Sequence, residues 1–394
     1  MKYRITNGLL LTPNGIEQKD LLIADGKIEA IIPQNAEVSG DYQTLDCGGR
    51  YVSAGFVEIH QHGGGGSDYM DNDPDAFLNA TNAHLAHGMT SVMPTLLSAD
   101  QNALLSAIDR YLQAKKDPRI LCNLLGVHIE GPYISPDQAG AQKPEHIRVF
   151  DPKEYEAIAQ AAEGNIKRWS VAPEVEGAQE FAAFAKKNGI ALSIAHSNAD
   201  FDTVVRAFDW GFCHVTHLYS CISTITRHKG FRVPGILEAS YYLDGMDVEI
   251  IADGCHLPLS LLAYVAKFKE HSRIALITDA MRAAGQDVEK SFLGGRDDPL
   301  PVLIEDGVAK LEDRSAFGGS IATADRLIRN MVKAGVSLPD AVKMMTENPI
   351  RMMGLDVKKG SLIEGYDADL CIFDEEIRIH SVLCQGKLVD LASL

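Results

Sequence analysis

Short apolar runs alternate with helix-like stretches through most of the chain, and this alternation is its main structural signal. Eight such runs occur, at residues 56–59, 91–94, 124–129, 170–172, 191–195, 213–215, 248–252 and 274–278. Amphipathic stretches between them predict helices, for example over residues 75–87, 102–116, 180–188 and 257–269. Continuously apolar strands separated by helices are typical of a parallel sheet covered on both faces. The pattern therefore predicts a (β/α)8 TIM-type barrel over residues 54–355.

The two ends of the chain carry a different pattern. Near the N-terminus, residues 20–24 and 27–32 predict two strands joined by a turn at Asp25-Gly26. Further β-type runs lie near the C-terminus, at residues 368–373, 377–383 and 387–389. Neither end is large enough to bury a sheet face alone. We therefore expect one small β domain, a sandwich or barrel, built from residues 1–53 and 356–394.

The main alternative for the middle of the chain is a doubly wound open sheet. No Gly-x-Gly-x-x-Gly follows any of the eight runs, so the dinucleotide-binding version of that fold is disfavoured. The barrel prediction also agrees with the length, because 394 residues accommodate one large barrel and a smaller domain.

Composition and charge exclude several functional classes. Of the 394 residues, 46% are hydrophobic and 23% charged, which is ordinary for a globular protein. A formal net charge of −17 argues against a nucleic-acid partner, and no apolar stretch reaches the length of a membrane span. The seven cysteines show no Cys-x-x-Cys spacing, and the N-terminus lacks a secretory signal pattern. We therefore expect a reduced, cytoplasmic protein, in which an anionic substrate would need a local cluster of cations.

Residues able to bind a metal follow five of the eight predicted strands, where barrel enzymes carry their chemistry. They are His60, His62, Glu130, His196, His217 and Asp279. One such histidine alone would be best explained as an interior residue, but the chain has only 13 histidines, and the ordered set favours a metal site. His60 and His62 are two residues apart on a strand, so both imidazoles face the same side. These ligand types suit zinc, iron or another divalent ion.

The same residues suggest how the site would work. A carboxylate such as Glu130 can bridge two ions about 3.5–4 Å apart, and bound ions lower the pKa of water towards about 7. Asp279 is the candidate for taking the proton of that water and passing it to a leaving group. His128 precedes Glu130 by two residues and is either a partner of the ligands or a hydrogen-bonded interior histidine.

An ordered series of motifs extends over nearly the whole chain. It comprises AGFVEIHQHGGGGSD (54–68), HGMTSVMPT (87–95), GVHIEGPYISPDQAGAQ (126–142), VAPE (171–174), IAHSNA (194–199), THLY (216–219), RVPG (232–235), IADGCH (251–256), TDAMRAAG (278–285), FGGS (317–320) and KGSLIEGYDADLCIFD (359–374). The series resembles the amidohydrolase superfamily and, within it, the N-acetylglucosamine-6-phosphate deacetylases. The resemblance implies that Glu130, His196 and His217 are the main metal ligands. It also implies that His60 and His62 are a pair that only some members keep, so one or two ions fit.

The resemblance further implies hydrolysis of the acetyl amide of an amino sugar phosphate. Asp279 matches the catalytic base and acid, and His256 matches a histidine that contacts the substrate near the reacting amide. Ala141, Asp253 and the segment Phe317, Gly318 and Gly319 fall where family members contact the sugar. The products would be glucosamine 6-phosphate and acetate.

The chain departs from the family pattern at positions that bear on the substrate. Gln142 stands where a histidine is usual, and Ser220-Cys221-Ile222 replaces a sequence with an asparagine that normally faces the sugar phosphate. Gln142 and Ser220 can still donate hydrogen bonds, so we keep both positions, with Cys221, in the expected substrate site.

The loop with Arg227, His228, Lys229 and Arg232 is either an anion clamp or a solvated basic loop. In the family, an arginine here reaches the phosphate in the neighbouring subunit's site. The clamp interpretation therefore implies a homodimer, with Arg227, His228 and Arg232 as substrate-binding residues.

Other functions remain open on the residues alone. The substrate can be another N-acylated hexosamine, such as N-acetylgalactosamine 6-phosphate or an analogue without phosphate. A cyclic-amide or N-acyl-amino-acid amidohydrolase is disfavoured, because no lysine follows the fourth predicted strand at Val171-Ala172-Pro173-Glu174 to bridge two metals. A non-catalytic sugar-phosphate-binding relative would bind such a ligand without hydrolysing it.

Overall fold

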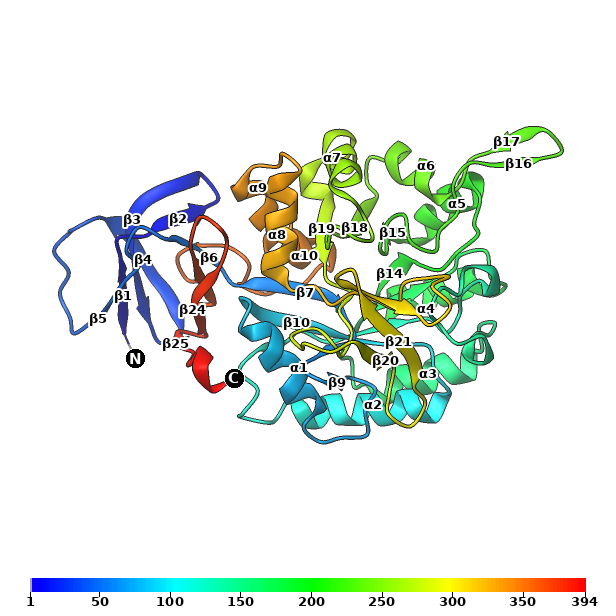
Figure 1. The fold of residues 1–394 in the computed structure, drawn as a ribbon, viewed down its shortest axis with the longest axis horizontal. Helices are drawn as coiled ribbons and strands as arrows, with labels where there is room; N and C mark the ends of the chain where they lie inside the picture. The colour runs from blue at the N-terminus through cyan, green and yellow to red at the C-terminus, as the bar shows by residue number, and fades with distance from the viewer. Residues whose placement is uncertain (1) are drawn as a thin grey trace.

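The computed structural model describes residues 2–394 and contains two main sheets, one at each end of the molecule's long axis (Figure 1). The middle of the chain forms a near-closed parallel barrel surrounded by helices. Strands from both ends of the chain form a mixed sheet beside it, so the two termini lie in the same part of the molecule. The predicted fold class is confirmed.

The barrel contains the eight predicted strands in chain order, and each lies where an apolar run was expected. They are β7 (Phe56–Gln61), β10 (Met89–Leu96), β12 (Val127–Glu130), β13 (Ile166–Val171), β14 (Ala191–Ile194), β15 (Phe212–Val215), β18 (Asp247–Ile251) and β19 (Ile274–Ile277). Neighbours pair in parallel from β7 through β10 to β19, and the short β11 (Asn123–Leu124) also pairs with β10.

The barrel closes between β19 and β7 through side-chain and loop contacts rather than a continuous ladder. The Asp279 amide donates to the His60 carbonyl oxygen (3.0 Å). Below this contact, the buried Glu58 carboxylate accepts from the backbone N–H groups of His60 and Thr278, each at 2.9 Å. Glu58 therefore fastens together the two strand ends that carry His60 and Asp279.

Helices pack around the barrel and account for the amphipathic stretches. They are α1 (Ala76–Leu85), α2 (Gln101–Ala114), α3 (Pro152–Ala161), α4 (Ala178–Lys187), α5 (Phe201–Trp210), α6 (Ile236–Tyr242), α7 (Leu259–Phe268), α8 (Ala324–Lys333), α9 (Leu338–Lys343) and α10 (Glu347–Met352). Local signals set several boundaries: α5 begins after Asp200, whose carboxylate accepts from the Thr203 amide, and ends at Gly211 in the left-handed region.

The terminal sheet joins the two ends of the chain directly. Its strands are β1 (Tyr3–Thr6), β2 (Leu9–Thr12), β3 (Gly15–Ala24), β4 (Lys27–Pro33), β5 (Gln43–Asp46), β6 (Tyr51–Ala54), β23 (Leu370–Phe373), β24 (Ile379–Cys384) and β25 (Lys387–Leu388). β6 pairs antiparallel with β23, while the predicted hairpin is confirmed as β3 and β4. Buried apolar residues of this sheet, among them Ile5, Leu21 and Leu370, form a hydrophobic cluster of their own. The domain limits at residues 53/54 and 355/356 stay a prediction.

Three small antiparallel sheets were not predicted from the sequence. β20 (Lys290–Leu293), β21 (Leu300–Glu305) and β22 (Val308–Leu311) form an antiparallel sheet after β19. β16 (Thr226–His228) and β17 (Phe231–Val233) form a projecting hairpin, and β8 (Gly63–Gly64) pairs with β9 (Ser67–Asp68). All of these strands are short, and only β8 and β9 among them are buried throughout. They therefore lack the apolar runs that identify barrel strands.

Within residues 2–394, every helix is too short or too polar to cross a membrane. All seven cysteines are free thiols.

Candidate metal centre and substrate cavity

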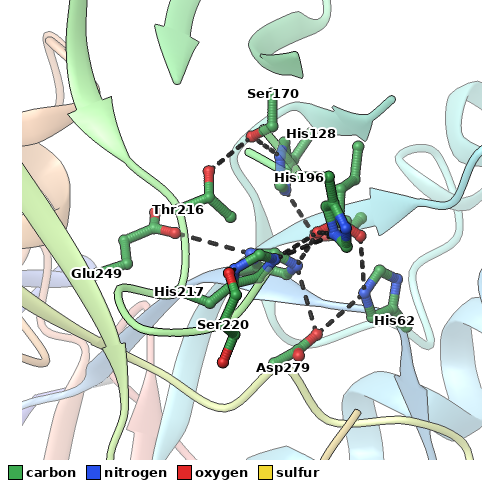
Figure 2. Close-up of polar contacts among 12 residues, drawn as sticks. His62, His128, Ser170, His196, Thr216, His217, Ser220, Glu249 and Asp279 are labelled. Carbon is green, nitrogen blue, oxygen red and sulfur yellow. Dashed lines mark hydrogen bonds and ion pairs between the residues drawn. The ribbon is translucent and has the colours of Figure 1, made fainter. Parts of the chain in front are cut away.

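The six expected metal ligands converge at the C-terminal ends of the barrel strands (Figure 2). They form two groups, His60, His62 and Asp279 in one and Glu130, His196 and His217 in the other. Within each group the candidate ligand atoms lie within 4.8 Å of one another, and all six residues are buried. His60 lies on β7, His62 directly follows it, and β12 ends on Glu130. The remaining three each lie two residues beyond the end of a strand, after β14, β15 and β19.

Glu130 contacts both groups. Its Oε1 lies 3.1 Å from His217 Nε2, 3.3 Å from His196 Nε2 and 3.4 Å from His60 Nε2. Its Oε2 lies 3.4 Å from His62 Nε2. Oε1 thus faces His196, His217 and also His60, while Oε2 faces His62. The carboxylate lies between the two groups, as a carboxylate that bridges two ions must.

Backbone carbonyls fix the tautomers of two of the histidines. The Nδ1 of His196 lies 2.8 Å from the Gln138 carbonyl oxygen, and the Nδ1 of His217 lies 3.1 Å from that of Ser220. A carbonyl only accepts, so each Nδ1 carries a proton. Nε2 is then the nitrogen that faces the centre of the cluster, and it can bind a metal once it has lost any proton of its own. This is the usual way in which a protein presents imidazole to a metal.

The other two histidines also fit a metal. Neither ring nitrogen of His60, nor Nδ1 of His62, has a hydrogen-bond partner among the described residues, although both rings are buried. Buried polar atoms are normally satisfied, so the unpartnered His60 nitrogens, which lie 3.4–3.7 Å from carboxylate oxygens, point to a cation between these groups. The all-nitrogen and oxygen donor set suits zinc or iron.

The charge balance of the cluster favours a cation as well. Burial disfavours protonation of His60 and His62, but Glu130 and Asp279 outweigh it and raise the pKa of His60 to about 9 and that of His62 to about 10. Burial alone would raise the pKa of Glu130 and of Asp279, but the facing imidazoles, His60 foremost, hold both below their usual range. Both carboxylates are therefore ionised at neutral pH and stabilise positive charge between them.

Backbone strain accompanies three of the ligands. His196, His217 and Asp279 have φ angles of 45°, 30° and 47°, in the left-handed region that costs energy for residues other than glycine. Such strain persists only where the surrounding structure enforces it, and here it turns side chains at the strand ends inward over the barrel.

A buried ion pair lies beneath the cluster, inside the barrel. Arg168 on β13 pairs with Glu249 on β18, and its guanidinium also donates to Ser193 Oγ (2.9 Å) and Thr216 Oγ1 (2.8 Å). Glu249 Oε2 lies 3.7 Å from His60 Nδ1 (Figure 2). This pair links four barrel strands or their ends and places a carboxylate behind a metal ligand, although the sequence analysis did not single out either residue.

His128 is a hydrogen-bonded interior residue that also packs against the cluster. Its ring nitrogens lie 3.0 Å from Thr95 Oγ1 and 2.7 Å from Ser170 Oγ. Its ring meets that of His60 edge-on, with centroids 4.8 Å apart. Both earlier interpretations of His128 therefore hold in part: its polar atoms are satisfied within the barrel, while its ring supports a ligand.

A cavity of about 210 Å³ opens over the metal ligands. Seven of the expected substrate residues line it: Ala141, Gln142, Ser220, Cys221, His256, Phe317 and Gly319. Leu97, Ile251, Leu293 and Ala316 also line it and were not expected, because apolar wall residues carry no chemical signature in a sequence. Leu293 lies on β20, and Ala316, Phe317 and Gly319 follow β22, so the small sheet with its adjoining loop forms one wall.

Asp253 lies behind the cavity wall and supports His256. Its carboxylate accepts from the backbone amides of Cys255 and His256 and lies 2.8 Å from His256 Nδ1. The His256 ring packs against that of Phe317, with centroids 4.7 Å apart. Gly318 is held by a hydrogen bond from its amide to the Ala309 carbonyl oxygen (3.0 Å). These contacts place the imidazole Nε2 of His256, rather than the Asp253 carboxylate, on the cavity side.

The basic loop is a hairpin that projects away from the barrel (Figure 1). Arg227 on β16 stands directly opposite Arg232 on β17, and His228 stands opposite Phe231. Lys229 and Gly230, with φ angles of 47° and 90°, make the tight turn. The residues of the hairpin tip are exposed, and none of them lines the cavity of its own chain.

Comparison with known proteins agrees with this architecture. The model of the Amidohydrolase family matches residues 51–389. The chain therefore belongs to the amidohydrolase family.

Several similar proteins are named as deacetylases of N-acetylhexosamine 6-phosphates. The chain is 31% identical to an N-acetylgalactosamine-6-phosphate deacetylase of Escherichia coli O157:H7, over 96% of this chain and 97% of that protein. It is also 31% identical to an N-acetylglucosamine-6-phosphate deacetylase of Bacillus subtilis, over 93% of this chain and 91% of that protein. A crystal structure of the Pasteurella multocida N-acetylglucosamine-6-phosphate deacetylase superposes with a TM-score of 0.90 at 26% identity, covering 99% of this chain and 100% of that one. A mutant of the Mycobacterium smegmatis enzyme, in complex with N-acetyl-D-glucosamine-6-phosphate, gives a TM-score of 0.89 at 28% identity, covering 98% and 99%.

Proposed function

We propose that the protein is a metal-dependent deacetylase that hydrolyses N-acetylglucosamine 6-phosphate to glucosamine 6-phosphate and acetate. The observation that carries this proposal is the convergence of six candidate ligands, five of which, Asp279 among them, line one cavity. Relatives with this name over nearly the full length of the chain support it, as does the related structure that contains this sugar phosphate.

The ligand set would hold one or two divalent ions, with zinc and iron the best matches to its nitrogen and oxygen donors. Glu130, His196 and His217 would hold one ion, and His60, His62 and Asp279 would hold the other, with Glu130 facing both. Such ions supply Lewis acidity and lower the pKa of water towards about 7.

Asp279 would move the proton. Its carboxylate is ionised at neutral pH, lies 3.1 Å from His62 Nε2 through Oδ1, and lines the cavity. It can therefore accept a proton from the attacking water and deliver it to the amide nitrogen, which leaves as the sugar amine. His256, whose Nδ1 is held by Asp253, would present its other ring nitrogen to the substrate near the reacting amide.

The hairpin would act as an anion clamp for a second copy of the chain. Arg227 and Arg232 form a directly opposed pair of like charges, which destabilises a hairpin unless an anion lies between them. Neither forms an ion pair with any described residue, and both are exposed. Because the hairpin projects from its own barrel, the phosphate that it would bind belongs to the neighbouring site of a homodimer.

A second candidate substrate is N-acetylgalactosamine 6-phosphate. The Escherichia coli relative named for that sugar aligns with 96% of this chain, and the Bacillus subtilis relative named for N-acetylglucosamine 6-phosphate aligns with 93%. Gln142 and Ser220 line the cavity at positions where the family usually has other residues, and an altered donor set can change which sugar epimer is accepted.

A turnover screen tests the proposal. Purified protein loaded with Zn²⁺ or Fe²⁺ is mixed with N-acetylglucosamine, N-acetylgalactosamine and their 6-phosphates, and the release of acetate is measured. We expect a 6-phosphate substrate to be hydrolysed and to be preferred over the unphosphorylated sugar. Binding of the phosphosugars without acetate release would instead indicate a non-catalytic relative.

Asp279→Asn tests the proton-transfer role. The amide cannot accept the proton, so we expect kcat to fall by at least about 100-fold. Phosphosugar binding, measured by calorimetry, should persist, because the other cavity residues are untouched. A variant with normal turnover would rule out Asp279 as the proton carrier.

A further inference from the structure

Gln142 makes hydrogen bonds that its predicted place in the substrate site does not explain. Its Nε2 lies 2.9 Å from Glu130 Oε2, and its Oε1 lies 3.1 Å from the Ser98 backbone nitrogen. Only 6% of the residue is exposed. The side chain therefore spans the gap between the end of β10 and the carboxylate that lies between the two ligand groups.

The orientation of this amide is determined by its partners. A backbone N–H can only donate, so the atom of Gln142 that faces Ser98 must be the carbonyl oxygen. The NH₂ group then necessarily faces Glu130, whose ionised carboxylate can only accept. The alternative orientation would place two donors together at one end and two acceptors at the other.

Ser98 closes a ring with the same two residues. Its Oγ donates to the Glu130 carbonyl oxygen (3.2 Å), while its N–H donates to Gln142. The approach of Ser98 requires a glycine after Glu130, because a Cβ on Gly131 would lie 2.1 Å from Ser98 Oγ. Glu130 is thus held at its backbone and at its carboxylate by one hydrogen-bonded ring.

The segment that carries Gln142 is itself tethered. Lys143 forms an ion pair with Asp298, and His146 Nε2 lies 2.8 Å from the other oxygen of the same carboxylate. These contacts connect the segment to the turn between β20 and β21. Side-chain contacts of Lys143 and His146 therefore tie the segment that carries Gln142 to this turn.

The two oxygens of Glu130 have different surroundings, and Gln142 touches only one of them. Oε1 faces three imidazoles, whereas Oε2 faces His62 Nε2 at 3.4 Å and the Gln142 amide at 2.9 Å. A carboxylate oxygen has about two acceptor positions, so Oε2 can accept this hydrogen bond and still bind an ion. The hydrogen bond keeps Oε2 turned towards the group formed by His60, His62 and Asp279.

We infer that Gln142 is a positioning residue that holds Glu130 in its bridging orientation and thereby supports the second metal ion, the one beside His62. This inference rests on the proposed metal centre. Loss of the amide leaves the first ion its three ligands, including Oε1 of Glu130. The second ion then loses the oriented Oε2 of the carboxylate that it shares with the first.

Gln142→Leu tests the inference, since leucine fills a similar volume but donates no hydrogen bond. Metal-free wild-type and variant proteins are titrated with Zn²⁺ against a chelator, and bound zinc is counted by elemental analysis in the absence of any sugar. We expect two ions per wild-type chain, and in the variant a second-ion affinity weaker by about 10- to 100-fold with the first nearly unchanged.

Ser98→Ala is the matched control, because it removes the Oγ–H bond to the Glu130 backbone but keeps the N–H that orients Gln142. It should retain both ions. A purely structural role of Gln142 would lower the Tm of the metal-free variant and leave both zinc affinities intact. That result would overturn the inference, as would a wild-type chain that binds only one zinc. Because no sugar is present, failure of the deacetylase proposal would not change these readouts.

Discussion

Glu130 is the residue on which the site depends, because its two carboxylate oxygens contact histidines of both ligand groups. Four imidazole Nε2 atoms surround its two oxygens at 3.1–3.4 Å. In a low-dielectric interior, this many facing imidazoles require either protons or cations to balance the carboxylates of Glu130 and Asp279. Metal ions and protons therefore compete for the same ring nitrogens, and metal affinity must depend on pH.

The sign of that dependence follows from the raised pKa values. In the metal-free protein His60 titrates at about 9 and His62 at about 10, both because the carboxylates of Glu130 and Asp279 outweigh burial. At pH 7 both rings carry a proton that must leave before Nε2 can bind an ion. Zinc affinity is therefore expected to rise from pH 6 to about pH 9.

Calorimetry can count these protons directly. Zinc titrations at pH 7 in two buffers with different ionisation enthalpies should show a net release of protons, of at least two per chain when both sites fill, because the pKa of the His196 ligand is raised as well. Chelator competition at pH 6, 7 and 8 should give progressively tighter binding. Affinity that is flat over this range would mean that His60 and His62 are already neutral at pH 7.

At the scale of elements, the barrel positions its ligands by where its strands end. β7 and β19 lie next to each other without a continuous ladder, and Glu58 makes up for part of the missing pairing. Its two carboxylate oxygens accept one backbone N–H from each strand end. The strain at Asp279, with its φ of 47°, lies just beyond this fastening.

Glu58→Gln should weaken this closure. An amide offers one accepting oxygen instead of two, so either the His60 or the Thr278 N–H is left unsatisfied in the interior. We expect a loss of about 1–3 kcal/mol in the free energy of unfolding, seen as a Tm lower by several degrees. The exposed Glu176 provides a control, since Glu176→Gln is the same side-chain change at a position without buried partners. Equal Tm values for both variants would show that the fastening does not contribute.

The elements that sequence reasoning found are those with a strong local pattern. The eight buried strands appear in the sequence as apolar runs. The six candidate ligands lie at the ends of these strands, where the barrel determines both their burial and the side to which they point. The sheet β20–β22 lacked such runs, although its Asp306-Gly307 turn is a hairpin signal that could have revealed β21 and β22.

Other features depend on contacts between distant segments. Gln142 reaches Ser98 across 44 positions, and Arg168 reaches Glu249 across 81. No spacing rule connects such pairs. The interior position of Asp253, behind His256, likewise depends on how one turn packs. Arg168 and Glu249 were not assigned a role from the sequence, and Gln142 and Asp253 were assigned to the substrate site only through the resemblance to the deacetylase family.

At the scale of the whole molecule, charge is distributed unevenly. The chain carries a net charge of −17, yet the projecting hairpin presents Arg227, Lys229 and Arg232 close together, far from the terminal sheet (Figure 1). A phosphorylated substrate is repelled by the overall charge, so local cations at the entrance would be needed to bind it. In the proposed dimer each hairpin would supply them to the other subunit.

The double variant Arg227→Ala/Arg232→Ala tests this arrangement. Loss of the charge-assisted hydrogen bonds to phosphate should raise KM for the phosphosugar by about 10- to 100-fold. The KM for an unphosphorylated sugar should hardly change, and zinc content should remain at the wild-type value. Equal effects on both substrates would show that the hairpin does not bind phosphate.

Mixed dimers then decide which subunit each hairpin serves. In a dimer of one Asp279→Asn chain and one double-arginine variant chain, the arginine-deficient chain keeps Asp279 and receives intact arginines from its partner. One complete site per mixed dimer results, so equal mixing with subunit exchange should recover about a quarter of wild-type activity, whereas each variant alone is impaired. If each hairpin served its own chain, the mixture would show only the average of the two variants. Recovery at subsaturating phosphosugar, with light scattering to confirm the dimer, therefore separates a clamp that acts between subunits from one that acts within a chain.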